Sequence, residues 1–240
     1  MRAIVEIAAN SLDSALAAEQ GGADRIELCA ALELGGLTPS AGLIAQVRER
    51  VRIPVYVLIR PRAGDFVYSE SELGTMLRDV AQCAALGCDG VVIGALDENG
   101  AVDKRGCGEL IAGAAKLGVT FHRAFDMARD LSVALEDVIA LGCERVLTSG
   151  GESDALQGAA AIKALVAQAN DRICVMAGAG VDASNVASIR ATTGAAEFHA
   201  SAKRQLASRM SAHAREHLGM SAGEWRSDVE QIKAIVAALR

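Results

Sequence analysis

Aromatic residues and prolines are scarce in this chain of 240 residues: Phe, Trp and Tyr together make up 3% of it, and there are only 3 prolines. So few rings argue against nucleic-acid binding by base stacking. Basic residues are outnumbered as well, 24 against 30 acidic ones, and the resulting net charge of −6 repels polyphosphate. We therefore expect no nucleic-acid partner, and an anionic ligand must be held by a local site.

Long apolar runs are also absent. The N-terminus reaches Glu6 too soon to form the apolar core of a signal peptide. The longest uncharged stretch, residues 34–47, has 14 residues and is interrupted by polar ones, whereas a helix that spans a bilayer needs about 18 or more apolar residues. With 51% hydrophobic residues, the chain still has enough material for a packed core. We expect a cytoplasmic protein without a membrane partner.

The cysteines are too dispersed for a disulfide framework. No C-x-x-C motif occurs in the chain. The six cysteines stand at positions 29, 83, 88, 107, 143 and 174. We expect them to be reduced thiols, most of them packed as small buried hydrophobic residues.

A short phrase that joins an alanine-rich helix to a strand recurs along the chain. It begins with a glycine suited to a helix C-terminus, includes an acidic residue and enters an apolar run. Its four copies start at Gly22, Gly87, Gly142 and, more loosely, Gly194. Further strand-like runs cover residues 3–8, 54–59, 119–122 and 173–177. The pattern therefore predicts eight strands.

Eight helical stretches alternate with these strands. They are expected to begin near Leu12, Ser40, Ser69, Lys104, Leu131, Asp154, Asp182 and Asp228. Continuous apolar strands that alternate with helices are typical of a parallel (β/α)₈ or TIM barrel, and this chain length suits one. We predict an α/β fold with a single barrel domain over residues 1–240, and a doubly wound open sheet is the competing fold. A long loop, residues 203–226, is expected after the eighth strand.

Charged residues inside these strands mark the candidate site. Helices seal the outer face of a barrel strand, so a charge within the strand points inward, toward the open mouth at the C-terminal ends. This rule selects as candidate catalytic residues Glu6, Glu27, Arg60, His122 and, in the loop that follows, Asp126. Arg123 and His199 lie at the same rim and are candidate ligand-binding residues. The alternative is an interior ion-pair network that fixes the register of the barrel.

An imidazole beside two carboxylates suits general acid–base catalysis. We expect His122 to titrate near neutral pH and to exchange protons with a ligand. Asp126 lies a few residues further along the chain, so it is placed to orient the histidine or the arginines of the mouth.

A glycine-rich turn after the seventh strand predicts an anion site. Gly178 and Gly180 belong to the sequence AGAGV, and Ser201 and Lys203 follow the eighth strand. Barrels often bind phosphate between these two loops, because glycine lets backbone N–H groups approach an anion closely. Ser149, after the sixth strand, is expected to add a hydroxyl group. The alternative is a tight turn that the geometry of the chain alone requires.

One cysteine, Cys29, is placed at the mouth, just beyond the second strand. Because Cu(I) favours converging thiolates or thioethers, a copper site here depends on Cys29. A hard divalent ion held by Glu6, Glu27 and His122 is the other metal hypothesis.

Six sequence strings resemble those of the CutC family, which is named for copper homeostasis. They are GADRIELC at 22–29, GGLTPS at 35–40, IRPRAGDF at 59–66, VTFHRAFD at 119–126, RVLTSG at 145–150 and MAGAG at 176–180. The resemblance implies a cytoplasmic TIM barrel that forms a homodimer or a higher homo-oligomer and acts in copper homeostasis with copper binding. By position, Cys29 matches the thiol that the family carries after its second strand.

The chain departs from the family pattern at Ala8 and Ala9, where several members carry a thiol, and at Ala63, which is often glycine. The first departure leaves Cys29 without its nearest potential soft partner. Two hypotheses stay open. One is a copper-handling protein with Cys29 as a ligand, and the other is a barrel enzyme that acts on a small phosphorylated or carboxylated metabolite by His/Glu acid–base chemistry. A polar pocket for a small anionic ligand is expected at the mouth.

Overall fold

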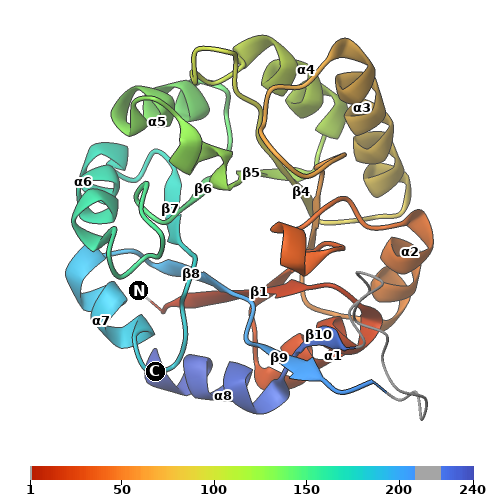
Figure 1. The fold of residues 1–240 in the computed structure, drawn as a ribbon, viewed down its shortest axis with the longest axis vertical. Helices are drawn as coiled ribbons and strands as arrows, with labels where there is room; N and C mark the ends of the chain where they lie inside the picture. Colours follow the sequence, from red (N-terminus) through yellow and green to blue (C-terminus); the bar gives the residue numbers. More distant parts are fainter. Residues whose placement is uncertain (1, 209–222) are drawn as a thin grey trace, which may run out of the picture.

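Eight parallel strands close into a barrel that is surrounded by helices (Figure 1). The computed structural model describes residues 2–208 and 223–240. The barrel strands are β1 (Ile4–Ala9), β2 (Arg25–Leu28), β3 (Val55–Leu58), β4 (Gly90–Ile93), β5 (Gly118–Phe121), β6 (Arg145–Thr148), β7 (Cys174–Ala177) and β8 (Glu197–Ala200). Strand β8 pairs with β1 and closes the sheet. The predicted barrel is confirmed, and the open sheet is excluded.

The helices that cover the barrel alternate with its strands along the chain. They are α1 (Leu12–Gly21), α2 (Ala41–Arg50), α3 (Glu70–Ala85), α4 (Lys104–Ala114), α5 (Leu131–Ala140), α6 (Ala159–Ala169), α7 (Val186–Thr193) and α8 (Val229–Ala238). Two short 3₁₀ helices, η1 (Leu32–Leu34) and η2 (Arg123–Met127), lie in the loops after β2 and β5. In the part of the chain that the structure describes, no helix has the length and apolarity needed to cross a membrane.

The recurring glycine phrase ends helices as predicted. Helix α1 is followed by Gly22 with a φ of 84°, a left-handed conformation that glycine adopts without strain, and the Gly22 N–H donates to carbonyls of the last helical turn. Gly194 follows α7 in the same way, with a φ of 73°. At both joints the chain passes within a few residues from a helix into a barrel strand.

Two helices begin later than predicted. The carboxylate of Asp154 accepts hydrogen bonds from the N–H groups of Leu156 and Gln157, so it caps a turn, and α6 begins only after that turn. Asp182 accepts a hydrogen bond from the N–H of Ser184 and precedes α7 in the same manner. Acidic residues favour isolated turns as well as helix starts, which explains the early prediction.

The apolar core lies between the strands and the helices. Its main cluster joins alternate strand residues, for example Ile7 and Ile26, to buried helix residues such as Leu73. Because side chains alternate along a strand, the intervening residues point into the barrel. These include the buried Glu6 and Glu27. The apolar shell therefore stabilises the barrel, while the interior holds polar side chains.

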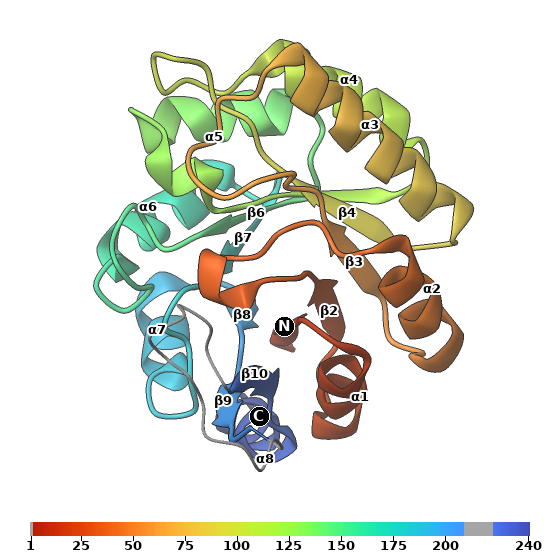
Figure 2. The ribbon, with the colours of Figure 1, turned by 45° about the vertical axis from the view of Figure 1, so that its right-hand side comes forward.

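The predicted long loop after the eighth strand contains two further strands. β9 (Lys203–Leu206) and β10 (Glu224–Ser227) pair antiparallel, and β10 packs beside β1 and α1 (Figures 1 and 2). Nδ2 of Asn10 donates to the carbonyl of Trp225 at 2.8 Å, and Oγ of Ser227 donates to the carbonyl of Ala8 at 3.0 Å. The second strand of this segment is thus fixed beside the end of β1, and residues 209–222 lie outside the described residues.

Candidate active site

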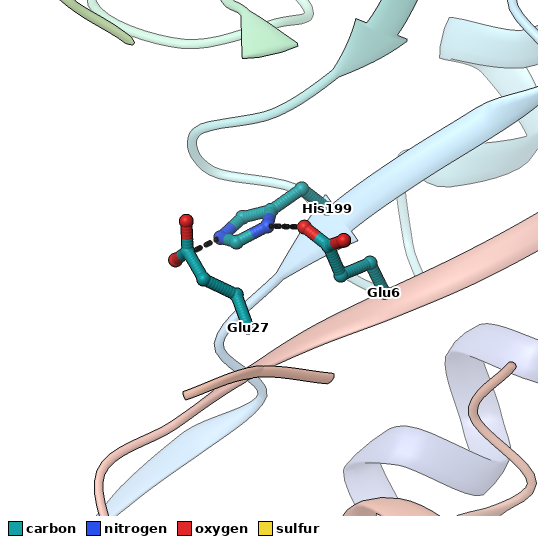
Figure 3. Close-up of side chains that lie close together, drawn as sticks. All are labelled: Glu6, Glu27 and His199. Atoms are coloured by element: carbon teal, nitrogen blue, oxygen red, sulfur yellow. Dashed lines mark hydrogen bonds and ion pairs between the residues drawn. The ribbon is translucent and has the colours of Figure 1, made fainter. Parts of the chain in front are cut away.

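Glu6, Glu27 and His199 meet inside the barrel near its mouth (Figure 3). Nδ1 of His199 donates to Oε1 of Glu6 at 2.8 Å, and Nε2 of His199 lies 3.8 Å from Oε2 of Glu27. The exposed fractions of the side chains are 13% for His199, 9% for Glu27 and 1% for Glu6. One imidazole is therefore held between two shielded carboxylates.

The register of the barrel strands brings these residues together. Strand β1 lies between β8 and β2, and Glu6 is paired directly with His199 across β1 and β8. Glu27 on β2 is paired with Ala8, two residues further along β1. Sequence reasoning predicts a catalytic role for the two glutamates and a ligand-binding role for His199. The structure joins all three in one cluster.

Burial and neighbouring charges give the three groups different acidities. Burial alone raises the pKa of Glu6, but the charges of Arg25 and His199, with their hydrogen bonds, lower it to about 2. Burial raises the pKa of Glu27 to about 7, because the charge of His199 offsets only part of the effect. Burial opposes protonation of His199, yet Glu27 and Glu6 outweigh it and raise its pKa. Glu6 is therefore an anion at neutral pH, while the pKa values of Glu27 and His199 both lie above their ordinary values.

The same three side chains offer metal-ligating atoms. One such atom from each lies within 4.8 Å of the others, in the one group of this kind among residues 2–208 and 223–240. The predicted ligand set for a hard divalent ion named the wrong histidine, because His199 and not His122 lies beside the two glutamates. Oε2 of Glu6 already contacts the guanidinium of Arg25, so a resident cation neutralises this carboxylate. We therefore interpret the cluster as an acid–base group.

A cavity of about 290 Å³ opens at the mouth of the barrel. Its lining consists of Glu27, Leu34, Gly35, Leu58, Arg60, Phe66, His122, Arg123, Asp126, Met127, Leu147 and His199. Half of these residues are charged or hydrogen-bonding side chains that the sequence predicts as candidate site residues. The volume lies near the lower end for ligand pockets, so the cavity suits a small molecule.

Arg60 is held in the cavity wall by backbone carbonyls. Its guanidinium donates to the carbonyls of Leu34 and Gly36 at 2.9 Å each and to that of Gly64 at 3.0 Å. It also lies over the ring of Phe66, 5.0 Å from the ring centroid. The side chain thereby ties the loop after β2 to the loop after β3.

His122 is a buried neutral imidazole. Its Nδ1 accepts a hydrogen bond from the N–H of Ala124 at 3.0 Å, so the proton of the ring is on Nε2. Burial, reinforced by the charge of Arg60, lowers the pKa of His122 to about 3. The expectation that His122 titrates near neutral pH is therefore wrong, because its closed surroundings penalise the charged form. Of the two histidines of the mouth, His199 is the one whose pKa is raised.

Asp126 and Arg123 join the loop after β5 to the loop after β6. The Asp126 carboxylate accepts hydrogen bonds from Oγ1 of Thr148 at 2.5 Å and from the N–H groups of Ser149 and Gly151 at 3.0 Å. Arg123 donates to Asp126 and to Oγ of Ser149, both at 2.8 Å. Because donors surround both of its oxygens, we interpret Asp126 as a positioning residue. The Arg123 side chain is 42% exposed at the rim.

The candidate anion-binding residues after β7 and β8 do not line this cavity. The N–H of Gly178 donates to a β6 carbonyl at 2.9 Å, and the carbonyl of Gly180 accepts a hydrogen bond from an amide side chain at the start of α7. Ser201 directly follows β8, and Nζ of Lys203 lies 5.0 Å from the centroid of the Trp225 ring. The N–H of Gly178 is thus used within the sheet, and an anion site at this turn stays a prediction, as does the alternative of a turn required by the chain geometry.

Cys29 does not fit the copper ligand that the family resemblance implies. It is 1% exposed in a small apolar cluster with Tyr56, Leu58 and Val92. Burial raises the pKa of its thiol, and the charge of Glu27 raises it further, so the thiolate that binds Cu(I) is disfavoured. The ligand cluster found in the described part of the chain contains no sulfur. All six cysteines are free thiols.

The alternative interpretation, an interior ion-pair network, applies to Glu6, which belongs to such a network toward the N-terminal end of the barrel interior. Sequence reasoning did not single out the other members of this network. Arg25 donates to Glu6 and, at 2.6 Å, to Glu197. Arg145 donates to Glu197 at 3.1 Å and to Glu144 at 2.6 Å. Arg25 and Arg145 occupy the first positions of β2 and β6. The rule that charges within strands point inward finds them when it is applied to strand starts as well as to strand ends.

The fold and the site together define a TIM-barrel protein with a small cavity, lined by polar and apolar side chains, at its C-terminal mouth. The model of the CutC family matches residues 3–204, and the chain belongs to this family. A CutC family protein of Xylella fastidiosa is 58% identical over 238 residues, which span 98% of this chain and 88% of that relative. A CutC family protein of Xanthomonas campestris is 55% identical over 236 residues, 98% of each chain.

Solved structures agree with this assignment. A candidate copper homeostasis protein CutC from Streptococcus agalactiae is 34% identical with a TM-score of 0.79, over 83% of this chain and 98% of that one. Thiamine phosphate pyrophosphorylase from Pyrococcus furiosus, 15% identical with a TM-score of 0.61 over 98% of this chain and 95% of that one, shares the fold alone. The family resemblance drawn from six sequence strings is confirmed.

Proposed function

We propose that this CutC family chain is an enzyme that transfers a proton on a small carboxylated or phosphorylated metabolite bound at the barrel mouth. Glu27 and His199 are its acid–base pair. The observation that carries the proposal is the coupling of these two groups, 3.8 Å apart, in the lining of a cavity that a small ligand can fill.

Glu27 is suited to exchange a proton with a bound ligand. Its pKa of about 7 gives the carboxyl group both protonation states near neutral pH, the condition under which a general acid or base is most effective. As a base, the ionised carboxylate takes a proton from a carbon or oxygen atom of the ligand. Glu27 then passes that proton to Nε2 of His199, and the imidazolium returns a proton to the ligand, which completes the exchange.

Glu6 acts through His199. Because it is a fixed anion bonded to the Nδ1–H group, it sets the tautomer of the ring, leaves Nε2 on the side of Glu27 and stabilises the imidazolium. Arg25 keeps Glu6 ionised. Glu6 is therefore a positioning residue that supports proton transfer without contact with the ligand.

Positive charge for an anionic ligand comes from Arg60, since Arg123, the other arginine of the cavity, is already paired with Asp126. The chain as a whole carries a charge of −6, so attraction of an anion is confined to this local site. The buried thiol of Cys29 offers no comparable arrangement for Cu(I). We therefore propose the acid–base cavity, and not Cys29, as the site at which this chain acts.

Hydrogen exchange in D₂O tests the proposal. The protein is incubated with a mixture of small carboxylated and phosphorylated metabolites, and mass spectrometry follows each compound. We expect one compound to gain deuterium or to be converted, and Glu27→Gln to abolish the change. The surface variant Arg62→Met serves as a control that retains it. A mixture left unchanged by the wild type, or changed equally by Glu27→Gln, overturns the proposal.

A further inference from the structure

Arg60 is a buried cation without a carboxylate partner. Arg25, Arg123 and Arg145 each form an ion pair with a carboxylate. Arg60 is 7% exposed and forms no such pair with any residue that the structure describes, where its hydrogen bonds go to backbone carbonyls. Its Nε has no hydrogen-bond partner within the same residues. A buried charge is stable only when it is compensated, so this wall of the cavity lacks one negative charge.

His122 supplies a second donor without a partner. Its Nδ1 is used by the N–H of Ala124, so Nε2 carries the proton, and no described residue accepts a hydrogen bond from it. A buried donor left unpaired destabilises a protein by about 1–3 kcal/mol. His122 and Arg60 both line the cavity, so a ligand bound there lies beside both residues.

The ring of Phe66 packs against both groups. Its centroid lies 5.1 Å from that of the His122 ring and 5.0 Å from the guanidinium carbon of Arg60. Both unpaired nitrogens are closed off from solvent in this arrangement. Phe66 belongs to the loop between β3 and α3 and is itself partly exposed. The ring of Phe66 is thus the neighbour that the two groups share.

We propose that the cavity binds a small monocarboxylate with an apolar body, whose carboxylate accepts hydrogen bonds from Nε of Arg60 and Nε2 of His122 once the ring of Phe66 has turned aside. This inference rests on the proposed function, because it names the class of ligand for the same cavity.

The remaining lining of the cavity matches an apolar body. Its apolar side chains are Leu34, Leu58, Phe66, Met127 and Leu147. Leu34 and Met127 are 51% and 66% exposed and both line the cavity. An apolar ligand body covers both and removes their surface from water.

The charges favour a carboxylate over a phosphate. A single uncompensated arginine matches a ligand of charge −1, whereas a phosphate monoester carries about −1.5 to −2 near neutral pH. Arg123, the other arginine of the cavity, already donates to Asp126 and Ser149. Glu27, once ionised, repels a second negative charge. The additional negative charge of a phosphate monoester therefore has no cation to pair with in this wall of the cavity.

Isothermal titration calorimetry with four probes tests the ligand class: 3-methylbutanoate, acetate, 3-methylbutanamide and inorganic phosphate. We expect 3-methylbutanoate to bind most tightly and acetate more weakly, because acetate lacks the apolar body. The amide and phosphate should bind about tenfold more weakly or worse, the factor that one charge-assisted hydrogen bond supplies. Phosphate or the amide binding as tightly as 3-methylbutanoate, or no binding by either carboxylate, overturns the proposal.

Variants locate the contacts. Arg60→Met should weaken 3-methylbutanoate binding about tenfold or more, while Arg62→Met, a surface arginine outside the cavity lining, should leave it unchanged. Because Arg60 also ties two loops together, a measurement on the wild type stands beside the variant. The NMR signal of the His122 Nε2–H group should shift when 3-methylbutanoate is added. An unmoved signal at saturation, or unchanged affinity in folded Arg60→Met, contradicts the assignment.

Comparing binding with deuterium exchange separates this inference from the proposed function. Binding of 3-methylbutanoate that depends on Arg60, without deuterium exchange into any metabolite, overturns the function and supports the inference. Exchange confined to phosphorylated metabolites supports the function and overturns the inference. Glu27→Gln should keep carboxylate binding and lose exchange.

Discussion

The two ends of the barrel interior use the same kinds of side chain differently. Toward the N-terminal end, Arg25 and Arg145 share the carboxylate of Glu197 at 2.6 and 3.1 Å. At the mouth, Arg60 and His122 each keep a buried nitrogen for which the described residues offer no partner. The arginines of the first end are paired with carboxylates, whereas the two nitrogens at the mouth are the groups that the proposed ligand would bind.

The difference shows that pairing, more than residue type, separates structural charges from functional ones. Glu6 belongs to both ends: Oε2 contacts Arg25, and Oε1 accepts the hydrogen bond of His199. At Glu6 the structural network meets the acid–base cluster. We therefore expect changes at the N-terminal end to act on stability, and changes at the mouth to act on protons and ligands.

Removing Arg25 should have the largest effect. Arg25→Met leaves Glu6 and Glu197 buried without their shared cation, and loss of one partner of a buried ion pair destabilises a protein by about 3–5 kcal/mol. Urea unfolding measures the free energy. The control is Arg48→Met, whose partly exposed pair with Asp89 should contribute about 1 kcal/mol or less. If Arg25→Met and Arg48→Met lowered the free energy of unfolding equally, the buried ion-pair network would stabilise the protein no more than a surface ion pair.

Glu27→Gln should change the pH dependence of stability. The folded-state pKa of Glu27 is raised from 4.5 to about 7, so the stability it contributes is fully present below pH 4.5 and is lost as the pH rises through 7. Glutamine does not ionise. Between pH 4 and pH 8, the free energy of unfolding of the variant should therefore rise by up to about 3 kcal/mol relative to that of the wild type. Urea unfolding at both values measures this. A difference that stays constant with pH contradicts the raised pKa.

Asp126→Asn should have a smaller, local effect. The substitution removes the negative charge that holds Arg123 and one set of hydrogen-bond acceptors for the loop after β6. We expect the free energy of unfolding to fall by about 1–2 kcal/mol. Amide hydrogen exchange should accelerate at Ser149 and Gly151, whose N–H groups bond to Asp126. Unchanged protection at these two amides would show that the carboxylate does not position the loop.

Cys29→Ser should have the smallest effect of these variants, because we expect no change in the amount of copper that the protein binds. The thiol is buried and its pKa is raised, so the wild type and the variant should take up the same amount of Cu(I) in an anaerobic titration. A loss of one Cu(I) equivalent in Cys29→Ser would restore Cys29 as a copper ligand.

The fold was accessible from the sequence because its signals are local. Glycines such as Gly22 end helices at regular intervals, and buried parallel strands read as continuous apolar runs. The glutamates of the site were accessible for a related reason, since a charge such as Glu6 or Glu27 inside an apolar strand has to point inward.

The roles of the two histidines were not accessible, because they depend on contacts distant in sequence. The pKa of His199 is raised because the barrel register brings Glu27 and Glu6 beside its ring. His122 stays neutral since Arg60 and the surrounding core enclose it. The glycine turn stays a predicted anion site, although the N–H of Gly178 is already used by the barrel sheet, which no local pattern reveals.

The most direct test of the acid–base pair is an NMR titration of the His199 ring nitrogens in the wild type and in Glu27→Gln. The pKa of Glu27 is about 7, and that of His199 is raised above 6.5. We predict that the wild-type ring reports two ionisations, one near pH 7 from Glu27 and one of its own, and that the first disappears in Glu27→Gln. A single wild-type transition at the ordinary histidine pKa, unchanged by Glu27→Gln, would contradict the coupling on which the proposed chemistry depends.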